Sequence, residues 1–258
     1  GQVAAGQAAI NQQGTTLTVT QGTPRAVVNW QGFSIAAGET TRFIQPSVSA
    51  AILNRVQGFG PSRLDGSLTA NGQVFLINPN GVLIGPGGRI ETGAFSASTL
   101  NISDAAFMSG GNLDFAGDSA AGISNLGIIK AATGDIVLAA RTVENAGALQ
   151  APNGVVGLAA GNEVLYRPGG AERLFVKSAL TLPEQTDGVK NTGLIEAAQA
   201  ELRAAGGNVY ALAVNNGGAI HATGVSLEDG RVLLTSTGGA ISAGGTITAV
   251  RADGDGGD

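Results

Sequence analysis

Short runs in which large aliphatic residues alternate with small ones recur along most of the chain. A five-residue pattern opens each unit: Gly, any residue, Ile or Leu, any residue, and usually Ala. The pattern starts at the following glycines: Gly66, Gly88, Gly127, Gly147, Gly193, Gly218 and Gly239. Alternation with a period of two is typical of β-strands, and closely spaced glycines argue against helices. The pattern therefore predicts a repetitive, strand-rich chain.

The spacing of these glycines indicates how the units are arranged. The steps between them are 22, 39, 20, 46, 25 and 21 residues. The two long steps are close to twice the short ones, so each is expected to contain one degenerate copy with an insertion. Units of this length cannot bury a face alone and must stack on one another. We predict an all-β fold, a right-handed single-stranded parallel β-helix with an N-terminal β cap and extra-helical hairpins.

The whole chain, residues 1–258, is expected to form a single domain. Residues 1–60 lack the repeat and contain Trp30, the single Trp, so they are predicted to form the cap and first strands. Residues 61–250 are predicted to form the coils. An excursion near residues 164–186 looks too polar for a core coil and is expected to project as a hairpin or loop. Residues 251–258, rich in Asp and Gly, are expected to be a flexible tail.

Composition removes several classes of function. A net charge of -5 with 14 Lys and Arg residues in no basic cluster disfavours a nucleic-acid partner. No apolar stretch is long enough for a membrane-spanning helix. The chain starts at Gly1 without a basic segment followed by an apolar one, so we expect that any signal peptide has already been removed from this sequence. With no Cys and one His, neither disulfides nor a thiolate or multi-His metal site is expected.

Catalysis is not predicted either, and no cofactor is expected. Polysaccharide-active β-helical enzymes need paired carboxylates or clustered Asp residues, whereas the acidic residues here are scattered. Glu196, Glu201 and Arg203 are interpreted as solvated, and His221 as an outward-facing surface residue. A polysaccharide-active enzyme, or a module that binds glycans or host cells, remains the alternative interpretation.

A series of short sequence motifs lies between Trp30 and about Phe115. They include Trp30-Gln31-Gly32-Phe33, Gln45-Pro46, Leu53-Asn54-Arg55-Val56, Ala70-Asn71-Gly72-Gln73-Val74-Phe75-Leu76-Ile77, Asn78-Pro79-Asn80-Gly81 and Ala97-Ser98-Thr99-Leu100. In these residues the chain resembles the amino-terminal two-partner-secretion domain, also called the haemagglutination-activity domain. That domain begins exoproteins similar to filamentous haemagglutinin and the high-molecular-weight adhesins of Gram-negative bacteria.

The resemblance implies a function in secretion. It implies that the domain is the secretion signal of a large exoprotein such as an adhesin, which passes through the periplasm and the outer membrane to become secreted or cell-surface bound. The implied partner is a cognate outer-membrane TpsB transporter, an Omp85-type β-barrel that captures the extended exoprotein through its periplasmic POTRA domains. A host-cell or glycan receptor would belong to the full-length protein. Folding of the β-helix at the cell surface is expected to draw the chain outward.

The same resemblance implies which residues carry the signal. The recognition residues carried over are Asn54, Arg55, Val56, Asn78, Pro79, Asn80 and Gly81, with Gln73, Val74 and Phe75 as the supporting strand. Independently of the family, Pro, Asn and Gly in this order favour a tight turn at residues 78–81. The recognition signal and the turn are compatible. For Asn54, a side chain that bonds local backbone at a corner and a role in the signal are both open.

Overall fold

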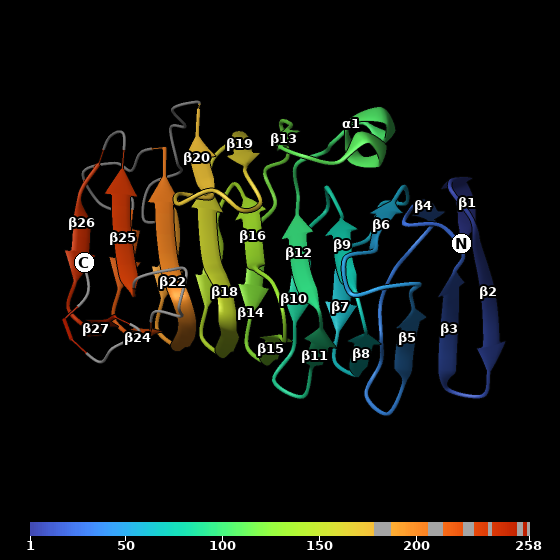
Figure 1. Cartoon of the computed structure of the whole chain (residues 1–258), viewed down its shortest axis with the longest axis horizontal. Helices are drawn as coiled ribbons and strands as arrows, with labels where there is room; N and C mark the ends of the chain where they lie inside the picture. Colours follow the sequence, from blue (N-terminus) through green and yellow to red (C-terminus); the bar gives the residue numbers. More distant parts are fainter. Residues whose placement is uncertain (178–186, 206–213, 224–229, 237–238, 252–254, 257–258) are drawn as a thin grey trace.

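The chain winds into an elongated parallel β-helix whose coils lie side by side (Figure 1). A computed structural model describes residues 1–177, 187–205, 214–223, 230–236, 239–251 and 255–256. Most coils contribute one strand to each of three faces, which we number in chain order. The predicted all-β, parallel β-helical fold is confirmed.

Face 1 is built from short parallel strands in strict register. For example, Val82 lies opposite Ser62 on one side and Ile123 on the other. The strands of face 1 are β7 (Ser62–Leu64), β10 (Val82–Ile84), β14 (Ile123–Asn125), β17 (Val143–Asn145), β21 (Val189–Asn191), β23 (Val214–Asn216) and β26 (Ile241–Ala243).

Face 2 contains the repeated Gly pattern except its last copy, and face 3 follows face 2 in each coil. The prediction for the last copy is wrong, because the residues after Gly239 form β26 of face 1 and Ile220 pairs with Ile247. Face 2 comprises β3 (Thr16–Gln21), β5 (Thr40–Ile44), β8 (Ser67–Ala70), β11 (Arg89–Thr92), β15 (Ile128–Ala131), the first parts of β18 (Ala148–Ala160) and β22 (Leu194–Ala204), β24 (Ala219–Thr223) and β27 (Thr246–Val250). Face 3 comprises β4 (Arg25–Trp30), β6 (Ala51–Val56), β9 (Gln73–Ile77), β12 (Ala94–Ser98), β16 (Ile136–Ala140), the second parts of β18 and β22, and β25 (Arg231–Ser236).

Two antiparallel strands cover the N-terminal end of the stack. β1 (Gln2–Ala5) pairs with β4, and β2 (Ala8–Gln13) pairs with β3. β3 and β4 already pair in parallel with β5 and β6 of the next coil. The antiparallel cap is therefore confined to the first two strands, and coil stacking begins well before residue 60. The antiparallel strands end the stack because a further coil would have to pair in parallel with β3 and β4.

The two long steps of the repeat each correspond to one coil plus an insertion. Ile90 pairs directly with Ile129, and Leu149 pairs directly with Ile195. The prediction of a degenerate extra copy in each step is therefore wrong. The inserted residues form an outer layer: α1 (Asp104–Ser109) and the antiparallel strands β13 (Leu113–Ala116), β19 (Glu163–Tyr166) and β20 (Leu174–Val176).

Helix α1 is the element that no sequence pattern above predicts. The Ser103 hydroxyl accepts a hydrogen bond from the backbone N–H of Ala106, which caps the first turn. Gly110, with φ +73°, ends the helix. Phe107 points from the helix into a buried cluster. A Ser-Asp pair before two alanines is a capping signal, but it is easily overlooked in a six-residue helix.

The outer layer also corrects the prediction for the 164–186 excursion. β19 and β20 form an antiparallel hairpin, but Val164, Tyr166 and Leu174 are buried. The described part of the excursion therefore packs on the coils and does not project from them. Residues 178–186 lie outside the described residues, as do most residues of the predicted tail.

The layer explains why face 3 strands read as continuous apolar runs. One buried cluster fills the inside of the coils, and a second lies between the outside of face 3 and the outer layer. In β9, Val74 and Leu76 point into the first cluster, whereas Phe75 and Ile77 point into the second. Strands covered on both sides lose the polar alternation that one-sided strands keep.

Candidate functional site

The residues predicted for recognition come together at one corner of the β-helix. Strands β6 and β9 are neighbours in face 3, where Asn54 lies opposite Leu76 and Arg55 opposite Ile77. Residues 78–81 follow β9 directly and lead into β10. The structure therefore places both motifs on adjacent coils. We call this region the 54–81 corner.

The predicted turn at residues 78–81 is present. The Gly81 amide donates to the Asn78 carbonyl across 3.1 Å, which closes a four-residue turn. Gly81 has a φ of +108°, a conformation that side-chain-bearing residues rarely adopt. The Asn78 side-chain oxygen also accepts from the Asn80 amide at 2.9 Å, the local bond that makes Asn common in turns.

Both asparagines of this turn also bond to a loop of the preceding coil. Asn78 Nδ2 donates to the Gly60 carbonyl and to Ser62 Oγ, each across 3.0 Å. Asn80 Nδ2 donates to the Gly58 carbonyl at 2.8 Å. The two side chains thus fasten residues 58–60, which connect β6 to β7.

The Asn54 side chain does not bond local backbone, which was one of its two open interpretations. It lies inside β6 and is fully buried. Its Oδ1 accepts from the Trp30 indole at 3.0 Å, and its Nδ2 donates to the Phe75 carbonyl at 3.3 Å. Asn54 therefore links the coil before it to the coil after it.

Arg55 and Val56 have structural contacts of different kinds. The Arg55 guanidinium donates to the Ile102 carbonyl at 2.6 Å and to Asn101 Oδ1 at 3.0 Å, and it pairs with Asp104. Arg55 thus holds the segment that enters α1 against face 3. Val56 is buried in the cluster inside the coils.

The supporting strand also contributes to both buried clusters. Val74 packs inside the coils, while the ring of Phe75 meets Phe107 of α1 edge-on with centroids 5.2 Å apart. Gln73 accepts a hydrogen bond at its backbone carbonyl from the Gln45 side chain.

The fold leaves little of the motif accessible to a partner. Asn54 and Asn78 are fully buried, whereas Pro79 is exposed and Asn80 is half-buried. In the folded domain, the buried Asn54 and Asn78 can affect contact with a partner only by fixing the positions of the segments to which they bond.

A second set of buried polar groups fastens the hairpin of β19 and β20. Asp135 accepts from the Tyr166 hydroxyl at 2.6 Å and from the Arg173 guanidinium at 3.1 Å. Glu201 accepts from the backbone amides of Arg173 and Leu174 at 2.7 and 3.0 Å. Burial, together with the negative charge of Asp135, raises the pKa of Tyr166 well above its ordinary value.

This set corrects the interpretation of Glu201 and Arg203 as solvated. Glu201 is fully buried, and Arg203 donates to it at 3.1 Å with only 11% of its own side chain exposed. Glu196 is half-buried on the outside of face 2 and accepts from Gln150 at 2.6 Å. The outer layer covers Glu201, and sequence periodicity cannot reveal such a covering.

The family comparison decides what kind of domain this corner belongs to. The profile described as the TPS secretion domain matches residues 1–249. The chain belongs to the TPS secretion domain family.

Known proteins similar to this TPS domain come from Haemophilus influenzae. Two heme/hemopexin-binding proteins are 37% identical over 100 residues and 40% identical over 86 residues. These matches cover 39% and 33% of this chain, but only 11% and 9% of the relatives. The aligned stretch therefore spans about a tenth of those longer proteins.

Solved structures agree with the family. The HMW1 secretion domain of Haemophilus influenzae is 27% identical, with a TM-score of 0.72, over 96% of this chain and 65% of its own. The filamentous hemagglutinin secretion domain is 16% identical, with a TM-score of 0.52, over 96% of this chain and 99% of its own. The second likeness supports the fold alone.

A ladder of identical side chains runs through face 1 of the TPS domain. Asn125, Asn145, Asn191 and Asn216 are each fully buried at the end of a short strand. Each of the first three donates its Nδ2 to the Oδ1 of the next at 2.8 Å. The sequence contains a signal for this ladder, since each Asn precedes a repeat glycine by two residues.

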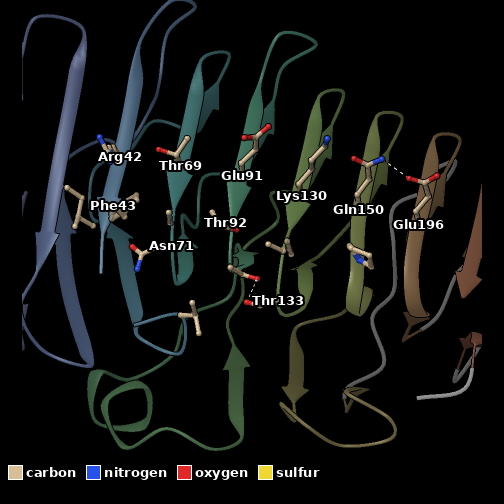
Figure 2. A pocket seen from close by; sticks show the side chains of 17 residues that line it. Arg42, Phe43, Thr69, Asn71, Glu91, Thr92, Lys130, Thr133, Gln150 and Glu196 are labelled. Atoms are coloured by element: carbon tan, nitrogen blue, oxygen red, sulfur yellow. Dashed lines mark hydrogen bonds between the residues drawn. The ribbon is translucent and has the colours of Figure 1, made fainter. Parts of the chain in front are cut away.

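The outside of face 2 is hollowed into a groove of about 1250 Å³ (Figure 2). Side chains from successive coils line it in this order: Arg42, Thr69, Glu91, Lys130, Gln150 and Glu196. Glu91 and Glu196 are three coils apart, about 14 Å at 4.8 Å per coil. Glycosidase carboxylates lie about 5–9.5 Å apart, so this pair does not have that geometry.

Two further observations concern the described part of the chain only. None of its helices is long and apolar enough to cross a membrane. No three His, Asp or Glu side chains in it are grouped so that they could hold a metal ion.

Proposed function

We propose that this TPS domain is the secretion signal of a large exoprotein, such as an adhesin, and that its cognate outer-membrane TpsB transporter recognises it through periplasmic POTRA domains. TPS secretion domains belong to exoproteins that cross the outer membrane. The observation that carries the proposal is the 54–81 corner. Residues 54–56 and 78–81 lie close together in the chain, so an extended segment can present both motifs to the transporter. When the domain folds, the same motifs come to lie on neighbouring coils and their asparagines hold the segments around them.

Export with the transporter tests the recognition role. The domain is co-expressed with TpsB, and Asn80→Ala is compared with Asn216→Ala. Asn80 is half-buried at the corner, whereas Asn216 ends the ladder far along the chain. We expect Asn80→Ala to reduce the secreted amount strongly and Asn216→Ala to leave it near the wild-type level.

The measurement is the ratio of secreted to periplasmic domain, with the melting temperature of each purified variant as the control for folding. Equal export of both variants, with equal stability, would contradict recognition at this corner. A depolymerising activity of the purified domain on polysaccharide would support the enzyme alternative.

We also propose that the N-terminal end nucleates folding of the β-helix at the cell surface. β1 and β2 close the edge of the first coil, and every later coil pairs with the one before it. A stack of this kind can grow from one end, and each added coil buries apolar surface that opposes backward movement. Deleting the residues before Trp30 removes β1 to β3 and all of β4 except Trp30. We expect this deletion to abolish secretion, and normal export of the deleted chain would refute nucleation at this end.

A further inference from the structure

A row of polar side chains crosses the outside of face 2 along the axis of the β-helix. Each member lies directly opposite the next one in the strand register, one coil or about 4.8 Å away. In order along the stack, the row consists of Thr18, Arg42, Thr69, Glu91, Lys130, Gln150, Glu196, His221 and Thr248. Figure 2 shows the six members from Arg42 to Glu196 side by side along the groove.

The charges of this row are only weakly satisfied within the domain. No hydrogen bond or ion pair joins the side chain of Arg42 or Lys130 to another described residue. Glu91 pairs with Arg89 at 3.6 Å, and about half of each side chain is exposed. Glu196 accepts a hydrogen bond from the neutral Gln150. The two cations and two carboxylates of the row therefore remain available to groups of another molecule.

The order of these charges is complementary to its own reverse. Arg42 lies two coils before Glu91. Lys130 follows Glu91 in the next coil, and Glu196 lies two coils after Lys130. A two-fold axis parallel to the strands, midway between Glu91 and Lys130, places a second copy face to face with the stacks antiparallel. The pairs between the copies are then Arg42 with Glu196, Thr69 with Gln150, Glu91 with Lys130, and the same three in reverse.

The same charges select this register over the neighbouring ones. If the second copy slides by one coil in one direction, the two Glu91 carboxylates face each other at the axis. If it slides by one coil in the other direction, the two Lys130 ammonium groups face each other. Like charges placed opposite each other across an interface are destabilising. The row therefore favours one antiparallel arrangement.

Exposed apolar side chains lie beside one end of the row. Ile44 and Val48 line the groove and are 40% and 59% exposed. They lie in the same coil as Arg42, or in the loop that follows it, and so face the coils of β18 and β22 in the second copy. Covering them adds an apolar contribution to the charge pairs.

The size of the paired surface indicates how strong the contact is. The row from Thr18 to His221 crosses about eight strands, so it is about 34 Å long, and strands of four to five residues are about 15 Å wide. The resulting area of about 500 Å² on each copy is typical of weak and transient interfaces. A dissociation constant in the micromolar range follows.

We propose that face 2 is a self-recognition surface on which a second copy of this domain docks antiparallel. A second copy is the occupant because the row contains the complement of each of its own charges. The proposal does not depend on the secretion function, and its test does not involve the transporter.

Analytical ultracentrifugation of the purified domain over a micromolar concentration series tests self-recognition. We expect the wild-type domain to dimerise, and more weakly as salt is added. We expect Lys130→Glu and Glu91→Lys each to weaken dimerisation by about 10-fold or more, because each places like charges opposite each other twice in the symmetric pair. A wild-type domain that stays monomeric throughout would overturn the proposal.

Face 1 supplies matched controls for net charge. Glu144 and Lys190 lie opposite each other in neighbouring coils and pair at 3.0 Å, as a similarly exposed pair on a different face. Lys190→Glu and Glu144→Lys make the same charge changes there, and we expect both to dimerise like wild type. If they weaken dimerisation as much as the face 2 variants do, net charge is the cause and the face 2 contact is wrong.

Mixing the two face 2 variants separates contact between copies from a change within one copy. In a mixed dimer of Glu91→Lys with Lys130→Glu, both pairs at the axis again join opposite charges. We expect the equimolar mixture to associate nearly as strongly as wild type, although neither variant does so alone. An unfolded variant cannot give this rescue, and the melting temperature of each variant should stay near that of wild type. A mixture that associates no better than its components would overturn the antiparallel arrangement.

Discussion

Buried polar side chains perform two different tasks in two regions of this β-helix, face 1 of the later coils and the places where a loop or the outer layer is attached. In face 1 of the later coils, each ladder asparagine bonds to its own counterpart in the next coil. Asn78 and Glu201, by contrast, have no counterparts; Asn78 bonds to the loop between β6 and β7, and Glu201 bonds to the hairpin of the outer layer. A repeated polar group is satisfied by repetition itself, whereas a unique one fastens an attached loop or hairpin. This difference teaches that a buried polar residue with no copy in the next coil marks an added segment.

The largest effect is expected where a unique buried charge is removed. Glu201→Ala leaves two backbone amides of the hairpin without their acceptor and removes one of the two carboxylates that pair with Arg203, the other being Glu172. Breaking a buried charge pair on one side costs about 3–5 kcal/mol of unfolding free energy. Denaturant unfolding measures this loss. Glu196→Ala, which removes a half-buried carboxylate on face 2, is the control and should change stability by less than about 0.5 kcal/mol.

A similar loss for both glutamate variants would mean that the hairpin is not held by Glu201. That result would contradict the distinction between unique polar groups, which hold an added segment, and polar groups that repeat from coil to coil.

A smaller effect is expected inside the ladder. Asn145→Ala removes the acceptor of Asn125 and the donor to Asn191. Two lost bonds at about 1 kcal/mol each, plus the cost of the groups left unpaired, predict a destabilisation of about 2–4 kcal/mol. The unfolding free energy from denaturant titration measures it.

The end of the ladder supplies the matched control for Asn145. Asn216 accepts from Asn191, but its own buried Nδ2 has no partner among the described residues, and Ala243 lies opposite it in the next coil. Asn216→Ala should therefore cost only about 0–1 kcal/mol, because removing an unsatisfied donor offsets part of the lost bond. An equal loss of unfolding free energy for Asn145→Ala and Asn216→Ala would contradict a stabilising contribution from the hydrogen bonds between successive ladder asparagines.

The smallest effect concerns pH. The raised pKa of Tyr166 means that the folded domain favours the neutral phenol, which donates to Asp135. Its contribution to stability is complete below the unfolded pKa of about 10. The contribution is then lost as the pH rises from about 10 toward the raised folded value. The stability gap between wild type and Tyr166→Phe, measured by denaturant unfolding, should shrink by about 1 kcal/mol or more from pH 8 to pH 11. A gap that stays constant over this range would contradict the contact.

Much of the fold could be predicted from local patterns, whereas the added layer could not. The Gly-Ile-Ala repeat predicts stacking because each unit shows the same alternation, and Pro79 with Gly81 predicts the turn because their backbone preferences are local. The 39-residue step suggested a second copy, yet Ile90 pairs directly with Ile129. Length alone does not distinguish a missing repeat from an insertion.

At the site, the sequence indicated which residues matter but not what each one touches. The match over residues 78–81 rests on residue types and order, which are visible in the chain itself. That Asn80 reaches Gly58, and Asn54 reaches Trp30, depends on which strands become neighbours. Glu201 looked solvated because charged residues usually are.

The period of small and aliphatic residues was enough to establish a stacked β-structure, and the order of short motifs was enough to establish the secretion-domain resemblance. Both depend on properties that each residue has within its own coil. The burial of Glu201, the role of Arg55 in holding α1 and the place of Lys130 beside Glu91 were decided only by the folded chain. Each of these arises from contact, or lack of contact, between segments far apart in sequence, and no local pattern encodes which segment will cover another.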